Sequence, residues 1–407
     1  MVPIILIFVS LSLGNFFEIP IGQLSYNIDY SEIFIILFSI YTFIKIIKEN
    51  KVRYISPYIG SLLAIFLGLF LYSIFTYAWS PYGLTVVPGA LIFFYGFISI
   101  FLANYYLENN SQIYIIAMRI FVLSIIVQLF YNFSVGLSGG VTGFYDLKDY
   151  ARTLIGKSNF ISIFISFDLL YEFISRDKYW KIFFLFSLAA LIATISRGAI
   201  VSLVIALAGY FIVGLVNKNI SKKKLILSFL TLFILFAAVM LFTAPGKVLL
   251  KGLSAGIGAS TVGTRQVLWA ESYTETLLNP LGVGIVWKGD PHNFIFSSLR
   301  NLGLFFGLTY IMTISFPIFI LIHPKVKYLS KRSIAILLAY LSVVVHSFIE
   351  VFFFTKLSVL FTIFTLVYMY ISIKQDIATL EENNDDTVKH IGKKYLFHNI
   401  LFNKLKN

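Results

Sequence analysis

The chain lacks cysteine altogether and has little charge. Of its 407 residues, 13% are charged and 58% are hydrophobic. Without cysteine it has no disulfides, no zinc–thiolate sites and no cysteine nucleophile. A soluble domain of this size would carry about twice this share of charged residues. The composition therefore predicts an all-α fold, a polytopic protein of transmembrane helices.

Motifs typical of soluble enzymes are also missing. The sequence contains no phosphate-binding P-loop, no pair of histidines at metal-ligand spacing and no Gly-Xaa-Ser-Xaa-Gly elbow. We therefore expect neither a metal nor an organic cofactor. The formal net charge is +13. In so apolar a chain, a basic excess marks cytoplasmic loops, so nucleic acid is not expected as a partner.

Long apolar runs are what the chain does have. A membrane-spanning helix needs about 20 predominantly apolar residues. The first run has no basic start and no small-residue cleavage site, so we interpret it as a span rather than a signal peptide. Twelve spans are predicted, near 2–14, 31–47, 57–77, 86–103, 113–134, 158–174, 182–195, 199–216, 225–243, 293–322, 333–349 and 357–373.

The apolar run 182–216, which contains a single charged residue, Arg197, is too long to be one membrane span. As one helix it would be about 52 Å long, far more than the ~30 Å hydrocarbon core. The basic segments 175–181 and 217–224 flank it, and both are expected on the cytoplasmic side. An even number of crossings must then lie between them, which predicts a turn at Ser196–Gly198.

The distribution of basic residues predicts the topology. With both termini in the cytoplasm, 21 of the 32 Lys and Arg residues fall in inner segments and 9 in outer ones. This arrangement gives a membrane domain, 1–373, with a large outer loop, 244–292. The tail, 374–407, has an acidic run and then a basic, partly apolar end, which favours a surface helix on the anionic inner leaflet.

Within the outer loop, the stretch TRQVLWAESYTETLL (264–278) predicts a helix lying at the membrane interface and ending at Pro280. Short outer segments disfavour basic residues, so the arginines on this side need a reason. Arg197 and Arg265 are each either structural or part of a clamp for phosphate oxygens, which the planar guanidinium binds well. For Arg152 the alternatives are a structural role or a weak substrate contact.

Three other titratable residues are predicted on the outer side. His292 begins a span, where it is either a polar cap or a general base. Asp290 would orient His292 or cap the helix. Glu350 lies four residues after His346 at the outer end of its span, so the two would pair with an arginine or line a polar cavity.

Three segments in order resemble the O-antigen ligase and polymerase family of bacterial polysaccharide assembly. They are TISRGAIVSLVIALAG (194–209), GTRQVLWAESYTETLLNPLGVGIVW (263–287) and HNFIFSSLRNLGLFFGL (292–308). The shared features are a Ser-Arg-small turn, an Arg followed by Trp269, a Pro followed by Gly-Xaa-Gly, and His-Asn opening a helix. Asn301 departs from the pattern, because many members carry an acidic residue there.

The resemblance implies a multi-spanning, metal-independent glycosyltransferase similar to the C-type enzymes. Arg197 and Arg265 would bind the undecaprenyl diphosphate leaving group, and His292 would take a proton from the acceptor hydroxyl. Arg152, Asp290 and Glu350 would support them. The implied location is the bacterial inner membrane, with the active site on its outer face. The implied partners are the lipid-linked glycan, membrane lipid, and chain-length regulator and flippase proteins.

Three functions are compatible with these sequence features. The first is a polymerase that joins undecaprenyl-diphosphate-linked repeat units into O-antigen, capsule or exopolysaccharide. The second is a ligase that moves finished glycan to lipid A-core or another acceptor. The segment between Arg265 and His292 is compact, which favours the polymerase. The third is a flippase or another transporter, against which the sequence shows no inverted repeat and no pair of broken helices.

Overall fold

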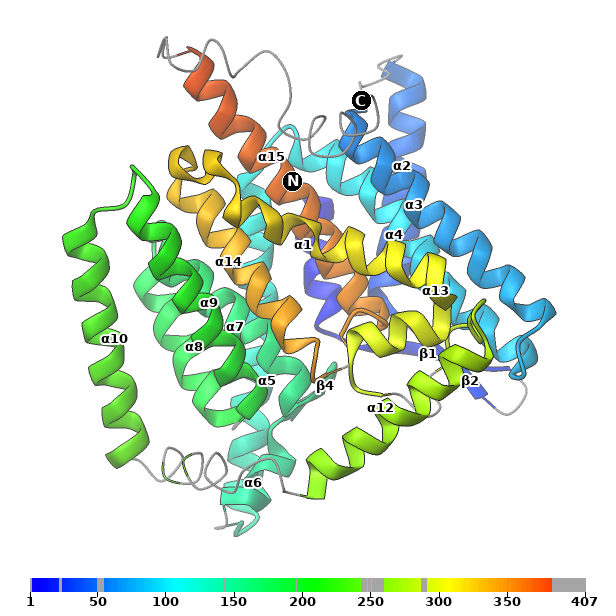
Figure 1. The fold of residues 1–407 in the computed structure, drawn as a ribbon, viewed down its shortest axis with the longest axis horizontal. Coiled ribbons are helices and arrows are strands. Elements are labelled where there is room, and N and C mark those ends of the chain that lie inside the picture. The colour runs from blue at the N-terminus through cyan, green and yellow to red at the C-terminus, as the bar shows by residue number, and fades with distance from the viewer. Residues whose placement is uncertain are drawn as a thin grey trace.

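The computed structural model is a bundle of helices (Figure 1). It describes residues 2–21, 24–49, 55–141, 144–194, 196–242, 247, 250, 260–286, 291–350 and 352–382. The helices are α1 (Val2–Leu11), α2 (Tyr30–Glu49), α3 (Pro57–Phe75), α4 (Val86–Leu107), α5 (Gln112–Ser138), α6 (Phe144–Tyr150), α7 (Ser158–Ser175), α8 (Trp180–Thr194), α9 (Arg197–Val216), α10 (Lys222–Phe242), α12 (Ser260–Leu278), α13 (Phe294–Ser315), α14 (Lys331–His346) and α15 (Lys356–Glu382). Short 3-10 helices follow α3, precede α4 and connect α13 to α14 (η1, Thr76–Ala78; η2, Gly83–Thr85; η3, Phe316–Ile322; η4, Pro324–Tyr328).

Each of the twelve apolar runs coincides over most of its described residues with a helix. In the described part of the chain, eight helices are long and apolar enough to cross a membrane, as an all-helical membrane protein requires. The predicted division of 182–216 is confirmed, since α8 ends at Thr194 and α9 begins at Arg197. Ser196 caps α9 by accepting a hydrogen bond from the Ala199 amide at 3.4 Å. The number of spans stays a prediction.

Two small β-hairpins add to the predicted helices. β1 (Asn15–Ile21) pairs antiparallel with β2 (Leu24–Asp29), and β3 (Arg152–Thr153) pairs with β4 (Gly156–Lys157). Both lie in segments too polar or too short to span. Pairing satisfies their backbone hydrogen-bonding groups in place of a helix. Both hairpins lie in the predicted outer segments 15–30 and 135–157, outside the predicted spans.

Segments predicted on the same side of the membrane contact one another. At the upper end of the bundle in Figure 1, the predicted inner segments are joined by Arg332–Asp177 (2.9 Å), Asn217–Val326 (2.7 Å) and Lys374–Glu108 (3.2 Å). At the other end, the predicted outer segments are joined by Lys356–Asp29 (3.5 Å), Trp79–Gly282 (2.9 Å) and His292–Glu350 (3.2 Å). Connections predicted to share a side of the membrane are thus neighbours in the structure, and the topology itself stays a prediction.

The two arginines inside predicted spans have structural partners. Arg119 donates two hydrogen bonds to Glu172, at 2.6 and 2.8 Å, between α5 and α7. Arg300 donates to Glu275 at 2.5 Å and so ties α13 to α12. A buried charge is costly unless it is paired. These pairs therefore hold helices together.

The predicted span 293–322 is not a continuous α-helix. α13 is broken at Gly303, whose φ of 72° and ψ of 178° are not helical. The segment after Pro280 lies against the break: the Leu304 amide donates to the Pro280 carbonyl at 2.9 Å, and the Gly284 amide donates to the Asn301 carbonyl at 3.0 Å. Backbone groups released by the break therefore find partners, as they must at membrane depth.

Candidate functional site

His292 stands immediately before α13 in a strained conformation. Its φ of 50° lies in the left-handed region, which non-glycine residues rarely occupy. The next residue, Asn293, caps the helix, because its Oδ1 accepts from the amides of Ile295 (2.9 Å) and Phe296 (3.2 Å). The cap is therefore Asn293. The capping role predicted as one alternative for His292 therefore belongs to its neighbour.

The start of α13 is docked onto the end of α14. The Phe294 amide donates to the Ser347 carbonyl at 2.9 Å, and Asn293 Nδ2 donates to the Phe348 carbonyl at 2.9 Å. α14 ends at His346 rather than at the predicted 349, and the chain then turns. Glu350 consequently lies in the turn beyond the helix, beside His292.

Glu350 joins two of the predicted site residues. Its Oε1 lies 3.2 Å from His292 Nδ1, and its Oε2 lies 3.6 Å from Arg265 Nη2. The Glu350 side chain is 15% exposed, whereas that of His292 is 43% exposed. The carboxylate is thus mostly enclosed while the imidazole is open to a substrate.

α12 supplies Arg265 and also contacts the residues on either side of His292. Trp269 follows Arg265 by four residues, so both lie on one face of the helix. Its Nε1 donates to the Pro291 carbonyl at 2.8 Å, and its ring stacks on that of Phe296 with centroids 6.0 Å apart. The prediction that 264–278 is helical is confirmed. The spacing of four residues between Arg265 and Trp269 places both side chains on the helix face that is turned toward His292.

Gly198 allows α9 to approach the same cluster. A Cβ on Gly198 would lie 2.5 Å from Ile349 Cδ1 and 2.8 Å from His346 Nε2. The first turn of α9, which begins with Arg197, therefore packs directly against the end of α14. His346 is buried there, and within the described residues its Nδ1 has no hydrogen-bond partner.

Lys148 of α6 is a cation of the site that sequence reasoning missed. Its pKa is lowered, first by burial and then by the positive charge of Arg197; Arg265 acts in the same sense, while Asp149 and Glu350 oppose the shift. Lys148 thus lies within electrostatic reach of both arginines. The scarcity of basic residues in outer segments was the signal that could have singled it out.

We call Lys148, Arg197, Arg265, His292 and Glu350 the outer cluster. Its members come from α6, α9, α12 and the connections before α13 and after α14. It holds three basic side chains, one imidazole and one carboxylate. Such a site favours an anion.

The structure does not bring every predicted residue into the outer cluster. The Arg152 side chain is exposed, and in the described part of the chain it forms no ion pair; its carbonyl accepts from Asn132 Nδ2 at 2.5 Å. Asp290 lies outside the described residues. Nor does any group of three or more His, Asp or Glu among the described residues gather closely enough to hold a metal ion.

The His292–Glu350 contact determines which imidazole nitrogen can act as a base. A carboxylate beside Nδ1 favours the tautomer that carries its proton on Nδ1. Nε2 is then the nitrogen that accepts a proton. The carboxylate also stabilises the imidazolium that forms. This arrangement suits general-base catalysis.

The stability contribution of Glu350 depends on pH. Burial raises its pKa, but the hydrogen bond from His292 and the charges of His292 and Arg265 outweigh burial, so the pKa lies below its ordinary value of 4.5. The ionised form is then favoured in the folded state, and its contribution is present above the ordinary value and lost as the pH falls through the folded value. We expect Glu350→Gln to lower the melting temperature in detergent at pH 7, and the difference from wild type to close on acidification to below 4.5. A difference that persisted unchanged would contradict this linkage.

Neither the models of known protein families nor the curated proteins match this chain.

Proposed function

We propose that this chain is a glycosyltransferase that polymerises undecaprenyl-diphosphate-linked repeat units into O-antigen, capsule or exopolysaccharide on the outer face of the inner membrane. The observation that carries the proposal is the outer cluster. In it, one carboxylate holds both an exposed histidine and an arginine, at 3.2 and 3.6 Å. The order of motifs noted in the sequence supports the same assignment.

His292 acts on the acceptor in this mechanism. As a hydroxyl of the acceptor sugar attacks the anomeric carbon of the donor glycan, its proton passes to His292 Nε2. The new glycosidic C–O bond forms, and the bond between the anomeric carbon and the diphosphate oxygen breaks. Glu350 stabilises the resulting imidazolium, which returns its proton to the leaving group or to water.

The cations of the outer cluster act on the leaving group. Negative charge grows on the diphosphate as its bond to the sugar breaks. Arg197, Arg265 and Lys148 are preorganised on three different helices to meet that charge. Stabilisation of this kind is often the largest contribution to an enzyme's rate. No metal ion is needed for it.

One observation also favours the transporter. α13 is broken at Gly303, and transporters bind substrates at broken helices. In the described residues, however, the break is filled by the segment after Pro280 through backbone hydrogen bonds of 2.9 and 3.0 Å. The members of the outer cluster lie at or near helix ends instead. The polymerase remains the better proposal.

The proposed function can be tested by identifying the glycans that accumulate in cells that lack this protein. We expect the acceptor to carry single-repeat glycan, because repeats are made and exported but not joined. Wild-type protein supplied in trans should restore long chains. Full-length polymer left on undecaprenyl diphosphate would indicate the ligase, and repeats retained on the inner leaflet would indicate the transporter. Extraction of lipid-linked glycans with electrophoresis of the surface glycan separates these outcomes.

A further inference from the structure

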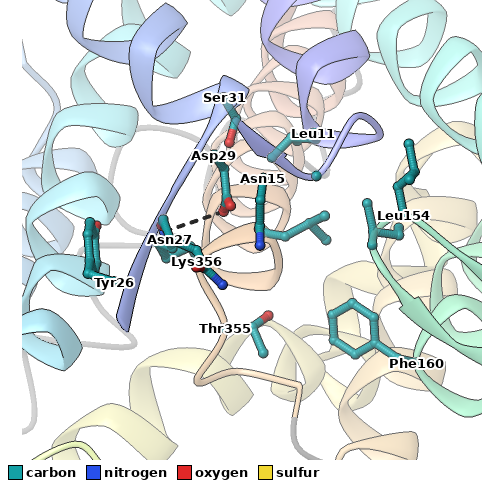
Figure 2. Close-up of a pocket in the computed structure, with 13 residues that line it drawn as sticks. Leu11, Asn15, Tyr26, Asn27, Asp29, Ser31, Leu154, Phe160, Thr355 and Lys356 are labelled. Atoms are coloured by element: carbon teal, nitrogen blue, oxygen red, sulfur yellow. Dashed lines mark hydrogen bonds and ion pairs between the residues drawn. The ribbon is translucent and has the colours of Figure 1, made fainter. Parts of the chain in front are cut away.

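A second hollow lies at the same end of the bundle as the outer cluster. It is a cavity of about 390 Å³ between the β1–β2 hairpin, the β3–β4 turn and the starts of α7 and α15. Figure 2 shows polar groups of Asn15, Asn27 and Lys356 on one side of it, with Leu154 and Phe160 on the other. Ligand sites commonly combine an apolar wall with a few polar groups in this way.

The polar wall of the cavity is equipped for a ligand rich in hydroxyl groups. Asn15 and Asn27 supply amides, Asp29 a carboxylate, and Ser31 and Thr355 hydroxyls. Oδ1 of Asn27 is buried, yet no described residue donates a hydrogen bond to it. A buried acceptor without a partner is costly, and Asn27 is one of the residues that line the cavity. The ring of Phe160 offers a flat apolar surface opposite.

The charge of the cavity excludes a phosphate as its ligand. Among the described residues that line the cavity, Lys356 is the one cation; it is 11% exposed and is already paired with Glu32 at 2.9 Å and Asp29 at 3.5 Å. It also donates to the Asn27 carbonyl and lies 4.3 Å from the centre of the Tyr26 ring. Two carboxylates to one ammonium leave no surplus positive charge, in contrast to the outer cluster.

The cavity is physically linked to the outer cluster. The connection between α14 and α15 carries Glu350 in the cluster and Thr355 in the cavity wall. These two residues are five positions apart, so their Cα atoms are at most about 18 Å apart. Between them, Phe352 packs on Phe160 with centroids 5.8 Å apart. A glycan of a few sugar rings can reach from one site to the other.

We propose that this cavity is a saccharide subsite that binds an uncharged sugar unit of the glycan whose reacting end lies at His292. The inference rests on the proposed function, because that function supplies the glycan. The outer cluster then recognises the diphosphate and performs the transfer, while the cavity recognises the sugar. Specificity for the repeat unit would reside in the β1–β2 hairpin and α15.

Asn27→Leu tests the subsite, because it removes the amide while keeping the size. The probe is the single-repeat oligosaccharide, released from its lipid by mild acid treatment of material from cells that lack this protein. We expect the Kd of this oligosaccharide to rise about tenfold, since one or two hydrogen bonds to a neutral ligand are lost. In polymerisation assays, KM for the repeat should rise similarly while kcat stays within about twofold.

Three variants make the result decisive. Asn109→Leu, the same change at an exposed position at the opposite end of the bundle, should leave Kd and KM unchanged. His292→Ala should abolish transfer but keep oligosaccharide binding. Asn15→Ala, at an exposed lining position, decides the matter if Asn27→Leu does not fold, as judged by thermal unfolding.

The outcomes separate the two proposals. Wild-type protein that polymerises repeats while both lining variants bind and react normally would overturn the subsite and leave the function intact. Wild-type protein that forms no polymer but binds the oligosaccharide through Asn27 would overturn the polymerase and keep the subsite. Inorganic diphosphate competing for the oligosaccharide site in the His292→Ala protein would also overturn the subsite.

Discussion

Replacing His292 or Arg265 by alanine is expected to stop chain elongation almost completely. Loss of a general base lowers rates by about 10²–10⁴-fold. Loss of a group that stabilises developing charge costs about 10²–10³-fold. The surface glycan should therefore shift from long chains to single repeats at unchanged protein level. Electrophoresis of the glycan together with quantitative immunoblotting of the membrane fraction provides the measurement.

Arg152 provides a matched control for these two variants. It is another arginine of the predicted outer side, but its side chain is exposed and lies outside the outer cluster. Arg152→Ala should elongate chains at close to the wild-type rate. Arg265→Lys keeps the charge but loses the planar fork, and should retain only part of the activity. Long chains made by His292→Ala cells would show that the catalytic assignment is wrong.

The second large effect is expected at Gly303, where alanine should prevent correct folding. A Cβ there would lie 2.5 Å from the Leu281 carbonyl carbon and 2.6 Å from the Pro280 carbonyl oxygen, and its φ is 72°. Those neighbours are backbone atoms, so no side-chain rotation relieves the clash. Left-handed strain adds about 1–2 kcal/mol. We expect a sharp fall in monodisperse protein on size-exclusion chromatography in detergent.

A glycine in open surroundings serves as the comparison. Gly68 lies within α3, and a Cβ there would meet nothing within 4 Å. Gly68→Ala should be neutral or stabilising by about 0.5–1 kcal/mol, because alanine has the higher helix propensity. Equal behaviour of the two variants would mean that the break in α13 does not depend on Gly303.

Features specified by neighbouring residues could be predicted from the sequence. The turn between α8 and α9 follows from basic flanks and an overlong apolar run. The end of α12 follows from Pro280, and its helical character from local composition. In each case the deciding interactions lie within a few turns of chain.

The composition of the outer cluster was only partly predictable. Counting basic residues selected Arg197 and Arg265, yet the same count passed over Lys148. Glu350 was expected at the end of a helix beside His346, but α14 stops earlier and the chain turns toward a residue 58 positions away. No local pattern encodes such a contact. The break at Gly303 was likewise not predicted, because the apolar sequence around it carries no signal that another segment packs against the helix.

The sequence by itself determined that this is a protein of apolar helices, that the run 182–216 is divided between two of them, and which residues carry charge. Hydrophobic periodicity, proline and glycine, and the cost of burying charge act locally and can be read along the chain. Only the tertiary structure decided that Glu350 holds His292 and Arg265, that Lys148 joins them, and that a neutral cavity lies nearby. Those features depend on distances between residues far apart in sequence, which are set when the helices pack.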